Sequence, residues 1–145
     1  MTLTAFVLVL WATGIGAWDF ARRRVPNFGL LLLLIPAVSA LVLRDSGLLG
    51  VDPATSLLGG VLPLMLMLPA YGHGWLGAGD VKLAAAMGLV LGPSPLALVL
   101  LLAALLLGGA SLWALYRGRS RDARMPTAPM LATAFGSVLA LAAFA

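Results

Sequence analysis

The sequence predicts an all-α integral membrane protein with six transmembrane helices and both chain termini outside the cytoplasm. Of its 145 residues, 62% are hydrophobic and 10% are charged, and the mean hydropathy is +1.08. These values lie outside the range of soluble domains. Long apolar runs with basic residues between them are typical of membrane helices. We therefore expect one polytopic membrane domain over residues 1–145, without a separate soluble domain.

Six apolar runs fill nearly the whole chain, and each is a candidate crossing. A bilayer core roughly 30 Å thick takes about 17 to 25 helical residues per crossing. The first run follows no basic residue and precedes no clear small-residue cleavage site, so we expect a retained anchor rather than a removable signal peptide. The runs span residues 2–18, 28–43, 54–71, 81–91, 96–116 and 127–144.

The stretch LGPSPL leaves open whether the fourth and fifth runs are one kinked helix or two helices, because Pro93 and Pro95 suit both. The basic residues decide between them. If every run crosses the membrane once, Arg44 is the only basic residue on one side. The positive-inside rule assigns that side to the outer face. Merging the two runs would divide the remaining basic residues. These are Arg22, Arg23, Arg24, Lys82, Arg117, Arg119, Arg121 and Arg124.

The fourth run is short for a crossing, since its 11 residues give a helix of roughly 17 Å. Either the helix extends into the preceding GHGWLGAGD segment, or that segment folds back into the protein. Irregular backbone at membrane depth is tolerated only beside protein or a watery cavity. Both alternatives place Asp80 near the inner face of the membrane.

Composition excludes several kinds of site. The absence of cysteine removes disulfides, thiolate metal sites and cysteine nucleophiles, and His73 is a lone histidine, so we expect no metal. The net charge of +4 comes from basic residues in the connections, which we read as topology signals beside the lipid bilayer rather than a nucleic-acid surface. The glycine pairs at 14 and 16, 59 and 60, and 108 and 109 favour close helix packing.

Two aspartates stand at the ends of apolar runs, and by this topology both lie on the inner side. Asp19 ends the first run and Asp80 begins the fourth, 61 positions later. An ionisable group within a membrane segment costs on the order of 3 kcal/mol, which makes each a functional candidate. Two ordinary roles remain open: Asp19 pairs with Arg22 or Arg23, and Asp80 caps the fourth helix.

A meeting of the two carboxylates has a chemical consequence. Two like charges about 4 Å apart repel by about 4 kcal/mol at an effective dielectric near 20, so one carboxyl keeps its proton near neutral pH. Aspartic proteases use this arrangement, in which the ionised member draws a proton from water and the protonated member protonates the peptide group. Gly77 and Gly79, just before Asp80, offer freedom for positive φ and space for another segment to approach.

The motifs around both aspartates resemble those of the type IV prepilin peptidases, membrane aspartic proteases of the Gly-x-Gly-Asp type. Asp19 is followed by ARRRVPN, and Asp80 lies in GAGDVKL. The resemblance extends to RMPTAPMLATA at the start of the last run, where Pro126 and Pro129 match a proline-containing motif. It implies that Asp19 and Asp80 are catalytic and that no cofactor is needed.

The resemblance also implies a substrate and a location. The substrate would be a prepilin or pseudopilin, with a basic leader joined to an apolar helix, cut at the inner face of a bacterial or archaeal cytoplasmic membrane. Larger members carry an additional cytoplasmic segment with paired cysteines and also methylate the product. This chain lacks that segment, so we expect no methyltransferase domain, and it looks like the compact peptidases of tight-adherence (Flp) pilus systems.

Seven further residues accompany the two aspartates in the candidate site. Lys82 lies about 200° around a helix from Asp80, so we expect it to face elsewhere and to anchor at the membrane interface. Asn27 is expected to cap the second helix, with Pro26 ending the first. The set is Pro26, Asn27, Gly77, Gly79, Lys82, Pro126 and Pro129.

Two other classes of function remain open from the residues alone. One is a small proton or ion carrier with titrating membrane aspartates, although carriers of this kind are expected to show related halves or matching broken helices, and the sequence contains neither. The other is a non-catalytic pilus assembly subunit in which the aspartates only hold helices together. Exchange of Asp for Asn separates the three, because it would abolish ion flux, assembly or cleavage respectively. The sequence does not fix the oligomeric state.

Overall fold

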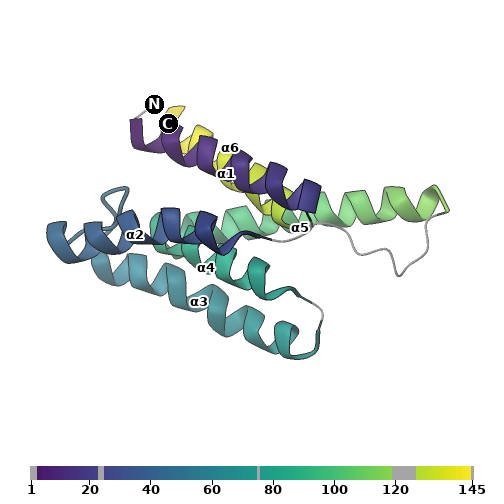
Figure 1. The fold of residues 1–145 in the computed structure, drawn as a ribbon, viewed down its shortest axis with the longest axis horizontal. Helices are drawn as coiled ribbons and strands as arrows, with labels where there is room; N and C mark the ends of the chain where they lie inside the picture. Colours follow the sequence, from purple (N-terminus) through teal and green to yellow (C-terminus); the bar gives the residue numbers. More distant parts are fainter. Residues whose placement is uncertain (1–2, 23–24, 75, 119–126, 145) are drawn as a thin grey trace.

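The described residues form six α-helices in the computed structural model, which describes residues 3–22, 25–74, 76–118 and 127–144 (Figure 1). Every apolar run is helical, which confirms the all-helical prediction. The helices are α1 (Leu3–Arg22), α2 (Asn27–Arg44), α3 (Pro53–Gly72), α4 (Ala78–Leu91), α5 (Pro93–Tyr116) and α6 (Ala128–Phe144).

Successive helices run in alternating directions, so the chain returns repeatedly to the same two ends of the bundle (Figure 1). One end gathers the C-terminal ends of α1, α3 and α5 with the N-terminal ends of α2, α4 and α6. The other end holds both chain termini and the connections from α2 to α3 and from α4 to α5. Alternating directions are what one membrane crossing per helix would require. The orientation of the bundle in the membrane stays a prediction.

The fourth and fifth runs are two helices, as the basic residues predicted. α4 ends at Leu91 and α5 begins at Pro93, with Gly92 between them at φ 80°. That backbone conformation is one that glycine adopts without steric cost. Pro93 then occupies the first turn of α5, where its missing N–H would have no helical partner. Chain reversal at this point is thus encoded by two adjacent residues.

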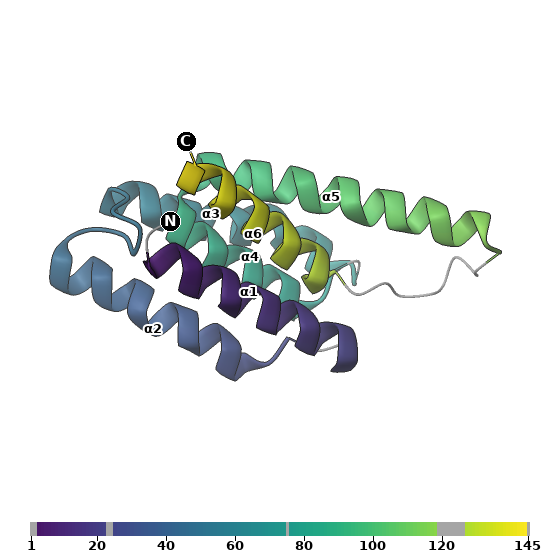
Figure 2. The same cartoon turned by 90° about the horizontal axis from the view of Figure 1, so that it is seen from above.

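Helix α4 is the centre of the bundle. It packs against α2, α3, α5 and α6, and eight of its 14 residues are buried, against four of 24 in α5. The view from above shows α4 surrounded by the other helices (Figure 2). Met87, Leu83 and Phe135 of α6 are among the largest fully buried side chains. After Lys82, α4 carries only apolar residues, and a helix segment that is apolar all round is suited to such a position.

Small residues allow α3 and α4 to approach closely, and α1 and α6 likewise. A Cβ added at Gly59 would clash with the Gly88 carbonyl, and one at Gly16 would lie 3.0 Å from the Cβ of Ala132. The predicted packing role therefore holds for Gly16 and Gly59. It is wrong for Gly14, Gly108 and Gly109, since a Cβ at any of these would meet nothing within 4 Å.

Among the described residues, four helices are long and apolar enough to cross a membrane: α1, α2, α3 and α5. α6 is apolar but shorter, and α4 begins only three residues before its apolar run. Fourteen residues give α4 about 21 Å, still less than the core of a bilayer. The chain is a multi-pass membrane protein, and the predicted count of six crossings stays a prediction.

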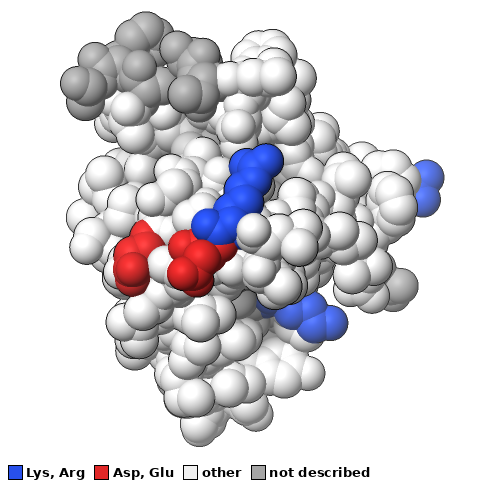
Figure 3. Space-filling model, turned by 90° about the vertical axis from the view of Figure 1, so that its left-hand side faces the viewer, with Lys and Arg blue, Asp and Glu red and all other residues white. Residues whose placement is uncertain are grey.

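Charged residues differ between the two ends of the bundle. Arg22, Lys82 and Arg117 belong to the end where α4 begins, whereas Arg44 ends α2 at the opposite end. The connection after Arg44 carries Asp45 and Asp52, and acidic and basic side chains lie side by side on this end of the molecule (Figure 3).

Candidate active site

Asp19 and Asp80 come together at the end of the bundle where α4 begins. Asp19 lies in the last turn of α1 and is only 6% exposed, while Asp80 lies in the first turn of α4 and is half-buried. The two carboxylates are close enough for their charges to interact. The fold therefore brings together two acidic groups that are 61 positions apart in the sequence.

The N-terminus of α6 binds both carboxylates through adjacent residues. The backbone N–H of Ala128 donates a hydrogen bond to Asp19, and the side chain of Thr127 hydrogen-bonds Asp80. The first N–H groups of a helix have no partner within the helix, and its dipole favours negative charge at that end. α6 thus supplies hydrogen-bond donors to both acids at one point.

Small residues on α1 explain how α6 reaches Asp19. Gly16 lies one turn before Asp19, and a Cβ at Gly16 would stand 3.5 Å from Cα of Pro129 and 3.0 Å from Cβ of Ala132. Ala12, one turn earlier, is fully buried. Because these positions carry little or no side chain, the α6 backbone lies against α1 and the N–H of Ala128 reaches the carboxylate.

Asp80 also stabilises the start of its own helix. The N-cap residue of α4 is Gly77, and the Asp80 carboxylate accepts a hydrogen bond from the Gly77 backbone N–H. This is one half of a capping box, in which the side chain three positions into the helix reaches back to the cap. The capping role expected for Asp80 is therefore correct in part, with Asp80 at N3 rather than at the cap itself.

The ion pair considered for Asp19 with Arg22 is not formed. The Arg22 guanidinium lies 4.5 Å from the ring centroid of Trp18, the residue before Asp19. Arg22 is exposed, whereas Asp19 faces α6. The alternative partner, Arg23, lies outside the described residues.

Gly77 and Gly79 serve close approach, and the expectation of positive φ is wrong for both. Gly77 has φ −78° and Gly79 lies within α4. A Cβ at Gly79 would stand 3.0 Å from Cβ of Val25, and one at Gly77 would stand 3.2 Å from an Asp80 carboxylate oxygen. The connection between α1 and α2 can therefore pack against the first turn of α4, which holds Asp80 near Asp19.

The predicted roles of Pro26 and Asn27 require correction. α1 ends at Arg22, and Pro26 is the N-cap residue of α2, where its carbonyl accepts hydrogen bonds from Gly29 and Leu30. Asn27 is the first residue of α2, and α2 has no side-chain cap. Proline takes the cap position here because it needs no amide partner.

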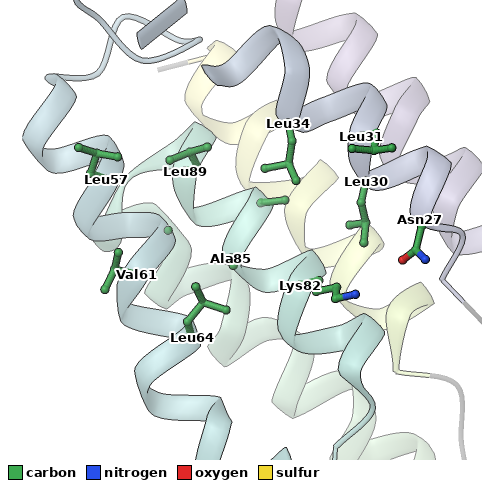
Figure 4. Close-up of a pocket in the computed structure, with 12 residues that line it drawn as sticks. Asn27, Leu30, Leu31, Leu34, Leu57, Val61, Leu64, Lys82, Ala85 and Leu89 are labelled. Carbon is green, nitrogen blue, oxygen red and sulfur yellow. The ribbon is translucent and has the colours of Figure 1, made fainter. Parts of the chain in front are cut away.

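Lys82 and Asn27 lie together at a groove on the other side of α4. The groove has a volume of about 600 Å³, is walled by leucines of α2 and α3, and has α4 as its floor. Asn27 and Lys82 are its polar residues, and both stand near one end (Figure 4). Lys82 lines this groove and neither aspartate does, which agrees with the expected separation of Lys82 from Asp80 around the helix.

Sequence reasoning missed Thr127 and Ala128 as contacts of the acids. Both residues lie in the segment RMPTAPMLATA, in which only the two prolines were assigned to the candidate site. Pro129 lies in the first turn of α6 beside Gly16, and Pro126 lies outside the described residues. The available signal was a hydroxyl residue just before a helix, which is a standard capping position.

Metal-binding side chains do not gather at this site. Within the described parts of the chain, no three His, Cys, Asp or Glu residues lie together in a way that could hold an ion. His73 contacts the Pro69 carbonyl through Nδ1 at 2.7 Å, at the end of α3.

Comparison with protein families identifies the chain. The model of the type IV leader peptidase family matches residues 6–112, well over half of the sequence. The chain belongs to the type IV leader peptidase family. The prediction made from the two aspartate motifs is confirmed at this level. Searches of curated proteins and of solved structures give no match.

Membership of the type IV leader peptidase family supports a protease that acts on prepilin-like substrates. The matched range includes Asp19, Asp80 and the helices that carry them. It ends within α5, so α6 and its contacts to the two carboxylates lie beyond it. The contribution of α6 to the site is known from the structure alone.

Proposed function

We propose that this protein is an intramembrane aspartic endopeptidase that removes the basic leader of prepilin-like proteins, with Asp19 and Asp80 as its catalytic residues. The observation that carries the proposal is that these two carboxylates, from different helices, are close enough for their charges to interact, in a chain of the type IV leader peptidase family. A structural role alone would not require two acids within range of each other's charge, because like charges repel and each is costly in a membrane.

The chemistry needs only the two carboxyl groups and one water molecule. Repulsion between the carboxylates favours a state in which they share a single proton. The ionised member accepts a proton from water, whose oxygen bonds to the scissile carbonyl carbon. The protonated member gives its proton toward the peptide group, the C–N bond breaks, and the new amine leaves with a proton. Water is consumed and no cofactor takes part.

The position of the acids fits a substrate that lies in the membrane. They stand at the end of the bundle where Arg22, Lys82 and Arg117 lie, which the positive-inside rule assigns to the cytoplasm. A prepilin joins a basic leader to an apolar helix. Its junction would therefore reach the membrane surface at the level of Asp19 and Asp80, on the inner face of a bacterial or archaeal cytoplasmic membrane.

Co-expression with a prepilin tests the proposal directly. Wild type, Asp19→Asn, Asp80→Asn and Asp45→Asn are compared for cleavage by mass and N-terminal analysis, with the amount of protein in the membrane measured for each. Asp45 is a matched control, because it is exposed at the opposite end and its φ of 49° is one that asparagine tolerates. We expect normal insertion of all variants and uncut precursor with the first two only.

Other outcomes favour the other classes of function. If Asp19→Asn or Asp80→Asn still cuts at the wild-type rate, the aspartic mechanism fails. Loss of protein from the membrane in both variants, without a specific loss of cleavage per molecule, would instead indicate that the acids hold the helices together. A proton flux in vesicles that disappears on either exchange, with no peptide product, would indicate a carrier.

A further inference from the structure

Thr127 and Ala128, adjacent residues at the start of α6, contact one carboxylate each. The side chain of Thr127 hydrogen-bonds Asp80, and the N–H of Ala128 donates to Asp19. We propose that Thr127 is a positioning residue, whose hydroxyl holds the carboxyl group of Asp80 in place. The proposal rests on the proposed function and adds to it a group outside the region that the family model matches.

The backbone of Thr127 is fixed, which makes its side chain a defined contact. Its carbonyl accepts hydrogen bonds from the N–H groups of Met130 and Leu131, both at 3.1 Å, so Thr127 stands at the N-cap of α6. The N2 position of that helix is Pro129, which has no N–H to offer a capping side chain. A threonine hydroxyl has one proton to donate, and a carboxylate can only accept. The Thr127 hydroxyl can therefore donate its proton to a carboxylate oxygen of Asp80.

Hydrogen-bond donors are distributed unequally between the two acids. Asp80 receives the Thr127 hydroxyl and the Gly77 N–H, whereas Asp19 receives the Ala128 N–H. Asp80 is therefore held by groups of two helices, α4 and α6, and its contact with α6 is made through the side chain of Thr127.

The packing of α6 fixes the spacing of these donors. α6 lies against α1 through Ala132 and Gly16, and against the buried face of α4. Because Thr127 and Ala128 are consecutive at the start of a helix that packs against both α1 and α4, they set where each carboxylate is bound relative to the other. Thr127 acts through Asp80 and is not itself a reacting group.

Purified enzyme in detergent with a synthetic prepilin-like peptide, a basic leader joined to an apolar segment, tests this role. The variants are Thr127→Val, Thr127→Ala and Thr127→Ser, with Thr133→Val as a matched control. Thr133 is also on α6, but it is exposed and its hydroxyl bonds the Met130 carbonyl of its own helix. Values of kcat and KM are measured for each variant, and thermal unfolding reports whether it is folded.

We expect Thr127→Val and Thr127→Ala to lower kcat on the order of 10- to 100-fold, the range for a lost hydrogen bond to a charged group, with KM little changed. Thr127→Ser keeps a hydroxyl and should retain most of the wild-type kcat, as should Thr133→Val. A merely structural role would lower stability and the amount of folded enzyme, and serine would not restore turnover specifically.

The contrary results are distinct from a failure of the proposed function. If a folded Thr127→Val or Thr127→Ala enzyme turns over at the wild-type rate, the positioning role is wrong, while Asp80→Asn measured beside it still reports on the mechanism. If Thr127→Ser is as slow as Thr127→Ala, the hydroxyl is not the acting group. Cleavage by Asp80→Asn at the wild-type rate would overturn both proposals.

Discussion

The aspartates at the two ends of the bundle make opposite kinds of contact. At the end that carries the connection from α2 to α3, Asp52 accepts hydrogen bonds from the backbone N–H and the hydroxyl of Thr55, at 3.2 and 3.3 Å. Asp45 follows α2 directly and adopts the left-handed conformation that ends it. At the other end, the donors to Asp19 and Asp80 include groups of α6, far away in the sequence.

Asp45 and Asp52 therefore act within one local turn of the chain, whereas the contacts of Asp19 and Asp80 require several helices to be packed together. Asp45 and Asp52 are exposed, so water solvates their charge, and the partner of Asp52 lies three residues away. Asp19 is buried and Asp80 half-buried, and each meets its partner only when α1, α4 and α6 are packed. An ionisable group in a membrane segment is costly, so two acids whose contacts depend on three packed helices are candidates for a functional role.

The sharpest test of this contrast is a double exchange. If Asp19 and Asp80 act as one unit, each single Asp→Asn variant should lose at least about 100-fold in cleavage, and the double variant should lose little more. The pair Asp45→Asn and Asp52→Asn should leave cleavage per folded molecule unchanged. Turnover of purified variants, normalised to folded enzyme, measures both pairs. Losses at 19 and 80 that multiply would mean independent roles.

A second test disturbs the site without removing an acid. In Gly79→Ala the new methyl group would stand 3.0 Å from Cβ of Val25, so the connection before α2 must shift by a few tenths of an ångström. Small displacements of reacting groups are expensive, and we expect cleavage to fall by about 10-fold while the enzyme stays folded. Gly14→Ala is the matched control, because nothing lies within 4 Å of its added Cβ. Equal activity of the two variants would contradict the packing argument.

Hydrophobic pattern and charge were sufficient to predict the helices and the path of the chain. The split between α4 and α5 followed from the basic residues, because Pro93 and Pro95 alone allowed either answer. The boundaries were less predictable. α1 continues to Arg22 and α4 begins at Ala78, since polar residues at a helix end cost little where water or a packed loop is near.

The aspartates were predictable as a pair, and their partners were not. The predicted topology places Asp19 and Asp80 at the same face of the membrane. It does not show which other helix contacts both carboxylates. That helix is α6, placed by the small side chains of Gly16 and Ala132. The same limit explains the error at Asn27, where the residue type suggested a cap and the adjacent proline took that position instead.

A third test removes a local contact at the opposite end. Asp52→Ala deletes the N-cap of α3, and the free energy of unfolding should fall by about 1 kcal/mol. Because the contact serves one turn, kcat per folded molecule should not change. Thermal unfolding in detergent and turnover of the folded fraction measure the two effects separately. A loss of turnover without a loss of stability would contradict the local role.

The smallest effect is expected at Lys82, two residues beyond Asp80. Its side chain lies in the groove with Asn27, on the other side of α4 from the carboxylates, so Lys82→Met should change kcat by less than about twofold. The methionine keeps the length of the apolar stem, which leaves the groove filled. Steady-state kinetics with the prepilin-like peptide give kcat and KM apart. A loss of kcat as large as that of Asp80→Asn would place Lys82 among the reacting groups, and the contrast between the two faces of α4 would then fail.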